Sequence, residues 1–394
     1  MRGAKRAEHM PRSAVLIVSQ ATSEGVAVCV RDLIEAAVSS GYHVTIACPA
    51  TGNLAAWATE RGAAWERLEM RRSPHHSDIA AIVRVRRLAR KHSLVHLHSS
   101  KAGTVGRLAL ASLGRRRPPS VFTPHGWSWL VGGWLSPLYR IIERILLPVT
   151  SAVVAVSAEE RSTGLNALGI GAARIRVIPN GVDISRFAPD GPVATRTDEP
   201  LLVSVGRLSY QRGPDTAVAA LALMRTPEAR LRLVGEGDDL PSIERQVRAL
   251  GLTARVELPG FRPDPAPDLR AADVVMIPSR YDGMALVLLE AMACGAAIVA
   301  TDVAGASALD GAGILVPPAD PEALAAAADE LLANANRRQS LGRAARTRVV
   351  QHYCLRRSID DTFRLWRELG ALPPSMTPTG EIPHKATLYG RTQG

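Results

Sequence analysis

Two series of short apolar runs, each alternating with longer Ala- and Leu-rich stretches, constrain the fold of this 394-residue chain more than any other feature. The short runs are rich in β-branched residues and end at turn residues, which predicts buried strands, whereas the longer stretches predict helices. Strands that are separated by helices pair in parallel through βαβ units. The sequence therefore predicts an α/β fold with doubly wound parallel sheets.

A Pro-, Thr- and Asp-rich segment, 188–200, separates the two series and lacks apolar periodicity. In the first series the strand candidates are 14–20, 43–49, 94–99, 119–125, 152–157 and 175–181, and the helix candidates include 27–40, 79–92 and 138–147. In the second series the strand candidates are 201–206, 230–235, 255–260, 273–279, 296–301 and 313–318, and helices are expected to begin near Asp215, Leu240, Asp268, Ala285, Pro321 and Arg337.

This organisation predicts two Rossmann-like domains, at 13–190 and 201–372, joined by a linker at 191–200. An amphipathic helix expected at 355–369 is a candidate to pack back on the first domain. The tails at 1–12 and 373–394 lack a core pattern, so we expect them to be disordered. Two such domains bind ligands in the cleft between the carboxyl ends of their strands.

The formal net charge of +11 arises in the first half of the chain, because residues 1–190 carry 25 Lys and Arg against 13 Asp and Glu. A one-sided basic surface suits a phosphorylated acceptor or acidic lipid headgroups, and a solvated arginine-rich face fits the same count. Nucleic acid is not predicted as a partner, since no helix-turn-helix, zinc-finger or RNP signature accompanies the charge.

The cysteines and the N-terminus indicate a reducing compartment, and we expect a cytoplasmic protein. The four cysteines are far apart in sequence and form no CxxC pair, which argues against a zinc site or a disulfide framework. The apolar run at 14–18 is too short for the core of a signal peptide.

The segment 279–301, "SRYDGMALVLLEAMACGAAIVAT", is apolar except near its start and at Glu290. A membrane-spanning helix is disfavoured, because Glu290 would lie near the middle of the bilayer. The pattern instead predicts a polar turn containing Asp282 and Gly283, followed by a helix from about Ala285. Free N–H groups at that helix start suit a phosphate, and Glu290 lies about 9 Å further along the axis, where a carboxylate can accept hydrogen bonds from a ribose diol.

Three other features are candidates for a site. Arg207 and Arg212 follow the first strand of the second domain, where two guanidinium groups can hold a diphosphate, although a pair of surface arginines is the simpler interpretation. The segment "SEGVA", with Gly25, is a weak glycine-loop signal. Three tryptophans, at 127, 129 and 134, could enter a membrane interface or hold a lipid-linked acceptor, and ordinary packing explains them equally well.

These motifs resemble the retaining GT-B glycosyltransferases of family 4, group 1 type. The resemblance covers roughly residues 14–369 and rests on "VHLHSSKAGTVGRLAL", "FTPHGW", "VIPNGVD", "SVGRLSYQRG", "DGMALVLLEAMACG" and "ILVPPADPEALA", which occur in the family's order. It implies a two-domain GT-B fold with a nucleotide-sugar donor bound mainly by the second domain. It also implies an acceptor bound mainly by the first domain and no required metal or other cofactor.

The resemblance assigns roles to individual residues. Glu290 matches the acid that binds the ribose, Asp282 the acid near the donor sugar, and Arg207 with Arg212 the basic pair on the diphosphate. His125 matches the histidine beside the donor sugar and acceptor, where it would donate a hydrogen bond. The expected catalytic set is His125, Arg207, Arg212, Asp282 and Glu290, and the expected donor-binding set is Gly25, Gly206, Arg207, Arg212, Arg262, Asp282, Gly283, Met284, Ala285, Leu286 and Glu290.

Several positions depart from the family pattern. Asp282 stands where Glu is commoner, Arg212 where Lys is usual, and Glu24 where a glycine often lies. Met284 and Ala285 replace Phe and Gly. Because Asp is one methylene shorter than Glu, the contact with the donor sugar is expected to differ.

Taken together, the sequence predicts a retaining, metal-independent hexosyltransferase that uses a UDP- or GDP-sugar. The leading acceptor is a lipid-linked or cell-surface polysaccharide intermediate, with peripheral contact to an anionic membrane, and a soluble small molecule is the alternative. A nucleotide-sugar epimerase and a non-catalytic nucleotide-sugar-binding protein on the same fold remain as rivals. A dehydrogenase is disfavoured because no intact GxGxxG follows a strand.

Overall fold

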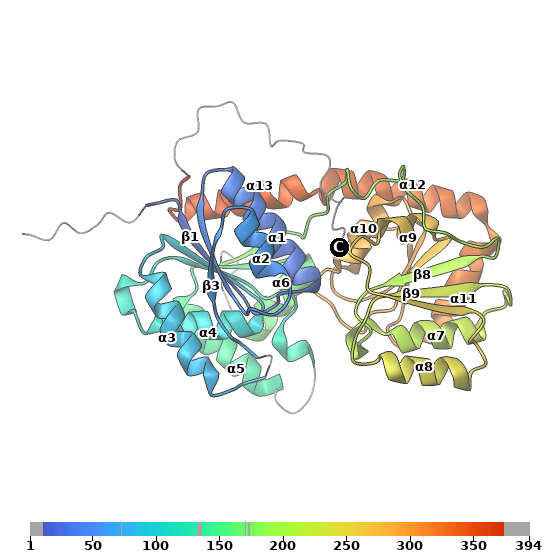
Figure 1. Ribbon diagram of the computed structural model, residues 1–394, viewed down its shortest axis with the longest axis horizontal. Helices are drawn as coiled ribbons and strands as arrows, with labels where there is room; N and C mark the ends of the chain where they lie inside the picture. Colours follow the sequence, from blue (N-terminus) through green and yellow to red (C-terminus); the bar gives the residue numbers. More distant parts are fainter. Residues whose placement is uncertain (1–10, 72, 132–135, 170, 172–173, 374–394) are drawn as a thin grey trace, which may run out of the picture. The chain divides into compact units, whose positions relative to one another are not determined.

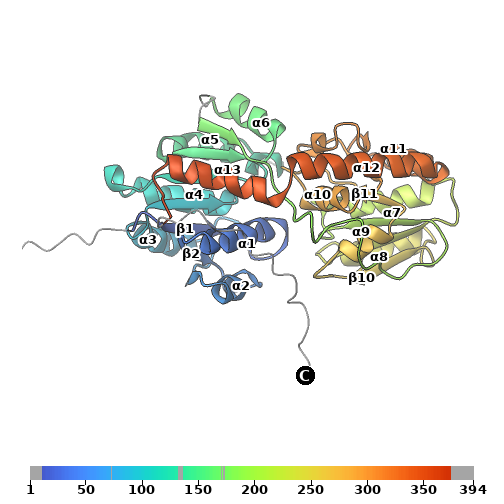
Figure 2. The ribbon, with the colours of Figure 1, turned by 90° about the horizontal axis from the view of Figure 1, so that it is seen from above.

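The computed structural model describes residues 11–373 except 72, 132–135, 170 and 172–173, so the expected tails lie almost entirely outside the described residues. The chain forms two compact units. Among the described residues, one unit comprises those up to Val121 together with those from Leu365 onward, and the other comprises those from Phe122 to Arg364, so the boundary falls within strand β5. Figures 1 and 2 show the elements of each unit in two views.

Within the described residues, the first half of the chain contributes a seven-stranded sheet of order β3-β2-β1-β4-β5-β6-β7. β1 pairs in parallel with β2 and β4, in the registers Ala14↔His43 and Val15↔Leu94, and β2 with β3 and β6 with β7 are parallel as well. The strands are β1 Ala14–Ser19, β2 His43–Cys48, β3 Ala64–Arg67, β4 Leu94–His98, β5 Ser120–Thr123, β6 Ala152–Ala155 and β7 Ile175–Val177. The helices are α1 Glu24–Ser39, α2 Leu54–Glu60, α3 Ser77–Ala89, α4 Ser100–Ala111, α5 Ser136–Leu146 and α6 Ala158–Leu168.

The second half contributes a six-stranded parallel sheet of order β10-β9-β8-β11-β12-β13 among the described residues. Its strands are β8 Leu201–Val205, β9 Arg230–Val234, β10 Val256–Gly260, β11 Val274–Ile277, β12 Ile298–Thr301 and β13 Ile314–Val316. Its helices are α7 Pro214–Leu223, α8 Leu240–Ala249, α9 Ala266–Ala271, α10 Leu286–Ala293, α11 Pro321–Ala333, α12 Ala335–His352 and α13 Leu355–Glu368.

Both faces of the second sheet are covered, which explains why its strands are apolar at successive positions. Val275 and Ile277 of β11 pack in one core with α9, α10 and α12, and the alternate residues Val274 and Met276 pack in the other core with α7, α8 and α11. Figure 1 shows α7 and α8 on one side of β8 and β9, with α9 and α10 on the other. The sheet therefore presents its ligand-binding edge at the carboxyl ends of its strands.

The predicted fold class is confirmed, and each strand and helix candidate named from the sequence corresponds to an observed element. The sequence analysis named no candidate for β3, α2, α4 or α6. β3 reads "AWER" and three of its four side chains are exposed, because it is the edge strand beside β2. An exposed edge strand needs no apolar run, so it leaves no burial pattern in the sequence.

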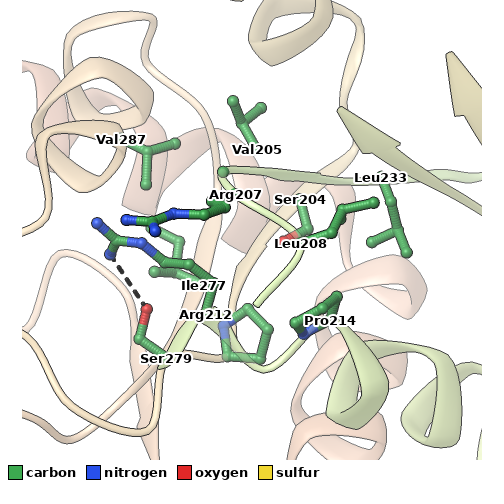
Figure 3. Close-up of a pocket in the computed structure, with 12 residues that line it drawn as sticks. Ser204, Val205, Arg207, Leu208, Arg212, Pro214, Leu233, Ile277, Ser279 and Val287 are labelled. Carbon is green, nitrogen blue, oxygen red and sulfur yellow. Dashed lines mark hydrogen bonds between the residues drawn. The ribbon is translucent and has the colours of Figure 1, made fainter. Parts of the chain in front are cut away.

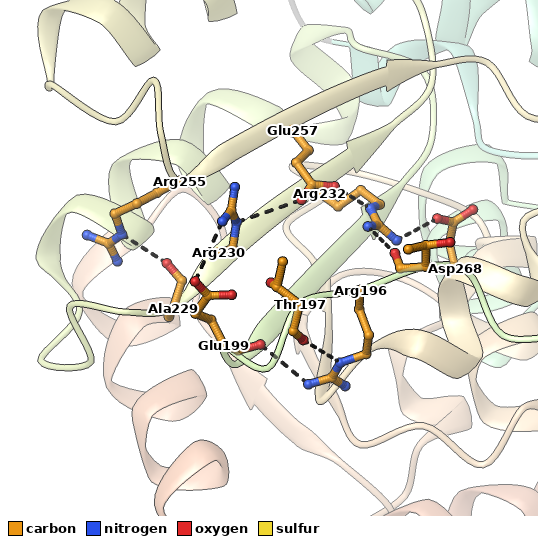
Figure 4. A network of polar contacts seen from close by, with 10 residues as sticks. Arg196, Thr197, Glu199, Ala229, Arg230, Arg232, Arg255, Glu257 and Asp268 are labelled. Carbon is orange, nitrogen blue, oxygen red and sulfur yellow. Dashed lines mark hydrogen bonds and ion pairs between the residues drawn. The ribbon is translucent and has the colours of Figure 1, made fainter.

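The segment expected to be a linker is held against the second sheet. Arg196 donates to Ala271 O at 2.8 Å and pairs with Asp273, while Arg232 Nη2 donates to Thr195 O at 2.8 Å. Figure 4 shows these arginines within a network that extends along β9 and β10. Within the first unit, the indole of Trp366, near the end of α13, donates to His96 Nδ1 at 3.2 Å.

The hypothesis that the tryptophans enter a membrane interface is wrong for Trp127 and Trp129, which are 2% and 7% exposed. Their rings stack at 4.6 Å between centroids, and Trp127 Nε1 donates to Glu160 O at 2.8 Å. These side chains therefore pack within the protein, and Trp134 lies outside the described residues. No helix in the described part of the chain is both long and apolar enough to cross a bilayer.

Candidate functional site

A pocket lies at the carboxyl ends of β8 and β11 in the second unit (Figure 3). The loop after β8 contributes Gly206, Arg207 and Arg212, the end of β11 contributes Ser279, and α10 contributes Val287. The side chains of Arg207 and Arg212 extend in the same direction in Figure 3. The structure thus brings together the two arginines that the sequence placed in one loop.

Glycine allows the loop after β8 to approach the end of β11. Gly213 has a φ of 64°, and a Cβ added there would lie 2.2 Å from Pro278 O. Gly206 has a φ of 154° and packs beside the aliphatic part of Arg212. A side chain at Gly213 would push the loop after β8 away from the loop after β11. Glycine is therefore required here for Arg207 and Arg212 to lie beside the loop after β11.

Arg212 forms an ion pair with Asp282, and its Nη1 also lies 3.4 Å from Ser279 Oγ. The second carboxylate oxygen of Asp282 accepts from the N–H of Gly283 at 2.9 Å. The Arg212 side chain is 27% exposed and that of Asp282 is 10% exposed. The pair is therefore accessible on the arginine side, where an anion could compete with Asp282.

Helix α10 begins at Leu286 with Ala285 as its N-cap, as predicted to within one residue, and no side chain caps it. Leu286 and Glu290, one turn apart, are its partly exposed residues, and the other six are buried. Met284 and Ala285 are each 6% exposed and belong to the same core. The apolar run thus fixes the helix so that one narrow face, carrying Glu290, is accessible.

His125 follows β5 in a tight turn, with φ of 54°, and Gly126 has φ of 98°. Burial lowers the pKa of His125 to about 4, so its imidazole is neutral at neutral pH. A Cβ added to Gly283 would lie 2.9 Å from Gly126 N and 3.3 Å from the carbonyl carbon of His125. The histidine turn and the Asp282–Gly283 turn are therefore in direct contact within the second unit.

Three polar residues at this contact were missed by the sequence analysis. Glu160 accepts from the N–H of Gly126, Glu159 accepts from that of Gly305 at 3.4 Å, and Asn180 Nδ2 donates to Met284 O at 2.9 Å. The spacing Ser157-x-x-Glu160 after a strand, typical of a helix start, was an available signal for Glu160.

Of the expected site residues, Gly206, Arg207 and Arg212 line the pocket, whereas His125, Asp282 and Glu290 do not. Arg262 and Gly25 also lie outside its lining. Both carboxylate oxygens of the fully buried Asp268 accept from Arg262 at 2.9 Å, in the loop after β10. Gly25 is the second residue of α1 in the other unit, directly after Glu24, which has a φ of 68°.

Two family models match the chain: "Glycosyltransferase Family 4" over residues 23–186 and "Glycosyl transferases group 1" over residues 190–348. A D-inositol 3-phosphate glycosyltransferase from Kineococcus radiotolerans is 34% identical over 300 residues, which cover 66% of this chain and 68% of that protein. The chain belongs to glycosyltransferase family 4. It is therefore a nucleotide-sugar-dependent glycosyltransferase, which removes the epimerase and the non-catalytic binding protein as leading alternatives.

Further relatives of this glycosyltransferase differ in their named acceptors. A GDP-mannose-dependent α-(1-6)-phosphatidylinositol monomannoside mannosyltransferase from Mycolicibacterium smegmatis is 32% identical over 73% of this chain and 77% of that protein. Among solved structures, Anabaena HepE in complex with UDP-glucose has a TM-score of 0.76 at 22% identity, covering 90% of this chain and 99% of that one. At that identity the structural match establishes the GT-B fold and nothing finer.

Proposed function

We propose that this enzyme transfers a hexose from a UDP- or GDP-sugar to an acceptor hydroxyl with retention at the anomeric carbon and without a required metal. One observation supports the proposal most strongly: Arg207 and Arg212 line one pocket with the end of β11 and with α10. Two guanidinium groups provide planar, charge-assisted donors for a diphosphate and can offset the negative charge that develops on it as the sugar leaves.

Glu290 extends the donor site along α10. Glu290 lies four residues, or about 6 Å, beyond the start of α10 on the partly exposed face that it shares with Leu286, so a donor whose diphosphate lies at the helix start has its ribose near Glu290. We assign Glu290 to the ribose diol and Arg262, in the loop after β10, to the region of the base. Gly206, Gly283, Met284 and Ala285 form the backbone of the proposed donor site, and Gly25 is a proposed donor contact from its match to the family's first glycine loop.

The ion pair between Arg212 and Asp282 links the proposed diphosphate contact to the proposed sugar contact. The donor diphosphate competes for the same guanidinium group, which frees one oxygen of Asp282 to accept hydrogen bonds from the hydroxyls of the donor sugar. Asp282 is shorter than the Glu that is commoner at its position, and Arg212 is longer than the usual Lys, so the two side chains still reach each other.

His125 contributes as a neutral hydrogen-bond donor, because burial keeps its pKa near 4. In the proposed reaction the acceptor hydroxyl attacks the anomeric carbon on the face from which the diphosphate departs. The leaving phosphate oxygen takes the acceptor's proton, so no side chain is needed as a general base. The bond from the anomeric carbon to the phosphate oxygen breaks and a glycosidic bond forms.

The acceptor we favour is a lipid-linked or cell-surface glycan intermediate, used by a cytoplasmic enzyme in peripheral contact with an anionic membrane. The basic first half of the chain supports it, and so does α5, where Leu138, Ile141 and Ile145 are 48%, 53% and 69% exposed beside the exposed Arg140. A soluble phosphorylated small molecule is the second candidate, supported by the inositol-phosphate glycosyltransferase relative.

The donor is tested by measuring nucleotide release with UDP-, GDP-, ADP- and TDP-sugars, in buffer containing EDTA, with lipid-linked glycan or inositol phosphate as acceptor. We expect release that depends on the acceptor and persists in EDTA, and a product whose anomeric configuration matches the donor. Inversion at the anomeric carbon would contradict the retaining mechanism, and loss of activity in EDTA would contradict the absence of a required metal. Turnover of the donor without any acceptor would favour an epimerase.

The membrane contact is tested by co-sedimentation with vesicles of phosphatidylcholine with and without phosphatidylglycerol. We expect salt-sensitive binding to the anionic vesicles that is lost in the double variant Ile141→Glu/Ile145→Glu. The matched control is Leu223→Glu/Leu250→Glu, which changes two exposed apolar residues, 50% and 44% exposed, by the same charge. Equal loss in both variants, or no binding by the wild type, would refute a contact through α5.

A further inference from the structure

Glu160, near the start of α6, is anchored by an unusual set of contacts. It is 1% exposed, and its two carboxylate oxygens accept from the backbone N–H groups of Gly126 and Val156, each at 2.6 Å. Ser157 Oγ accepts from Glu160 N at 3.1 Å and caps the helix, which fixes the backbone of Glu160. The carbonyl oxygen of Glu160 accepts from Trp127 Nε1. One residue therefore holds both Gly126 and Trp127, directly after His125.

The turn that Glu160 holds needs such an anchor. His125 and Gly126 both have left-handed backbone angles, and a non-glycine residue with a φ of 54° persists only where its surroundings fix it. Gly126 also contacts Gly283 so closely that a Cβ on Gly283 would lie 2.9 Å from Gly126 N. A shift of Gly126 would therefore move both His125 and the turn that carries Asp282.

We propose that Glu160, as a carboxylate, is the positioning residue of the active site: it holds the His125–Gly126 turn against the Asp282–Gly283 turn in the geometry that transfer requires. This inference rests on the proposed role of His125 and Asp282. Glu160 itself contacts neither donor nor acceptor in this scheme. Its effect is expected on turnover more than on donor affinity, because the arginines that bind the diphosphate lie on other loops.

The charges around Glu160 make its hold on the turn sensitive to pH. Burial, and then the negative charge of Asp282, raise the pKa of Glu160 to about 7, although the N–H groups of Val156 and Gly126 act to lower it. The other ionisable groups at the contact are His125, which is neutral, Glu159 on the same helix, and Arg212, which is paired with Asp282. Protonation of Glu160 converts one acceptor oxygen into a donor that faces an N–H, so one of its two backbone bonds is lost.

Protonation of Glu160 affects the stability of the folded state in the opposite direction to its effect on turnover. The folded pKa lies above the value of 4.5 for an ordinary Glu, so the folded state binds more protons between pH 4.5 and 7. The cost of burying the charge is present above about pH 7 and absent below about pH 4.5. Acidification therefore favours the folded state through this group while it weakens the turn needed for activity. A merely structural carboxylate would not couple stability and turnover in opposite directions.

The test compares wild type, Glu160→Gln and the control Glu159→Gln between pH 5.5 and 9. For the wild type we expect kcat to fall about tenfold per pH unit below pH 7, as for one essential ionised group. Glu160→Gln should lower kcat about 10- to 100-fold at pH 8, change the donor KM less than threefold, and abolish this pH dependence. Glu160→Asp should keep the pH dependence with partly restored kcat. Glu159→Gln should keep it as well. Burial raises the pKa of Glu159, but hydrogen bonds from Ser307, its own backbone, Ser157 and Gly305 together hold that pKa below its ordinary value.

Two readouts need no turnover and keep this inference separate from the proposed function. Amide hydrogen exchange at Gly126, corrected for intrinsic rates, should lose protection in Glu160→Gln and in wild type at pH 5.5, and retain it in wild type at pH 8. The Tm of Glu160→Gln relative to wild type should be higher at pH 8 than at pH 5.5. Unchanged exchange at Gly126, or a wild-type kcat in Glu160→Gln, would overturn the positioning role, whereas absence of transfer with altered exchange would count against the proposed function alone.

Discussion

Two arginine–aspartate ion pairs in the second half of the chain differ in environment. Arg232 and Asp268 are 6% and 0% exposed, and Arg232 also pairs with Glu257 and donates to Thr195 O (Figure 4). Arg212, which lines the pocket of Figure 3, is 27% exposed, and its partner Asp282 is 10% exposed. The first pair joins the linker to β9 and β10, whereas the second lies at the carboxyl ends of β8 and β11.

The difference shows that burial and the presence of other partners distinguish a structural ion pair from an ion pair that can bind an anion. A buried pair is costly to break, because removing one partner leaves an uncompensated charge. An accessible pair contributes little to stability and can exchange partners with an incoming anion. The two pairs should therefore respond in opposite ways to matched substitutions, in stability for one and in activity for the other.

The largest expected effect is on stability. Arg232→Met should lower the free energy of unfolding by about 3 kcal/mol, at the low end for a broken buried pair because Arg262 still pairs with Asp268. Urea denaturation of the purified protein checks it. A loss below about 1 kcal/mol would show that the buried pair is no stronger than an exposed one.

The next effect is on activity. Arg212→Met should lower kcat/KM about 100- to 1000-fold, because it removes charge stabilisation of the leaving diphosphate, and should change the free energy of unfolding by less than about 1 kcal/mol. Steady-state kinetics and urea denaturation on the same preparation measure both. A variant that is unstable yet fully active would reverse the assignment of the two pairs.

A smaller effect is expected at the other end of the donor site. Glu290→Gln should weaken binding of the nucleotide sugar about 10- to 100-fold, since it replaces charge-assisted hydrogen bonds to the ribose by neutral ones. Calorimetric titration measures the affinity, with the exposed Glu244→Gln on α8 as the control. Equal affinities for the two variants would remove Glu290 from the ribose site.

The smallest effect is expected for a fully solvated pair. Arg356→Ala removes the pairing with Asp360 on α13, where the two side chains are 78% and 56% exposed. The free energy of unfolding should change by less than about 0.5 kcal/mol, with unchanged kcat/KM. A larger loss of stability would mean that exposure alone does not determine how much each ion pair contributes to the free energy of unfolding.

The sequence predicted the two parallel sheets because buried parallel strands are continuous apolar runs, which are visible without a structure. It also placed Arg207 and Arg212 in one loop and Glu290 on the helix after the Asp282 turn, since these relations are local in sequence. The edge strand β3 was not predicted from the sequence, because an exposed strand carries no apolar run. Trp127 and Trp129 were open to an interfacial interpretation because composition does not report which side chains are buried.

Contacts between distant segments could not be predicted from the sequence. Glu160 and Gly126 are 34 residues apart, and Arg212 and Asp282 are 70 apart. Each of these contacts depends on which strands are neighbours in the sheet and on how the loops at their ends pack. The positive φ of His125 is likewise set by the contact with Gly283 and not by its own preference.

The central claim is that the arginines after β8 bind the donor's diphosphate. It is tested most directly by calorimetric titration of wild type and Arg207→Met/Arg212→Met with UDP, GDP and the corresponding nucleosides. For the nucleotide that the wild type binds, the double variant should lose at least about 100-fold in affinity, keep its affinity for the matching nucleoside, and retain the wild-type Tm. An unchanged affinity for the nucleoside diphosphate, with the fold intact, would contradict the account.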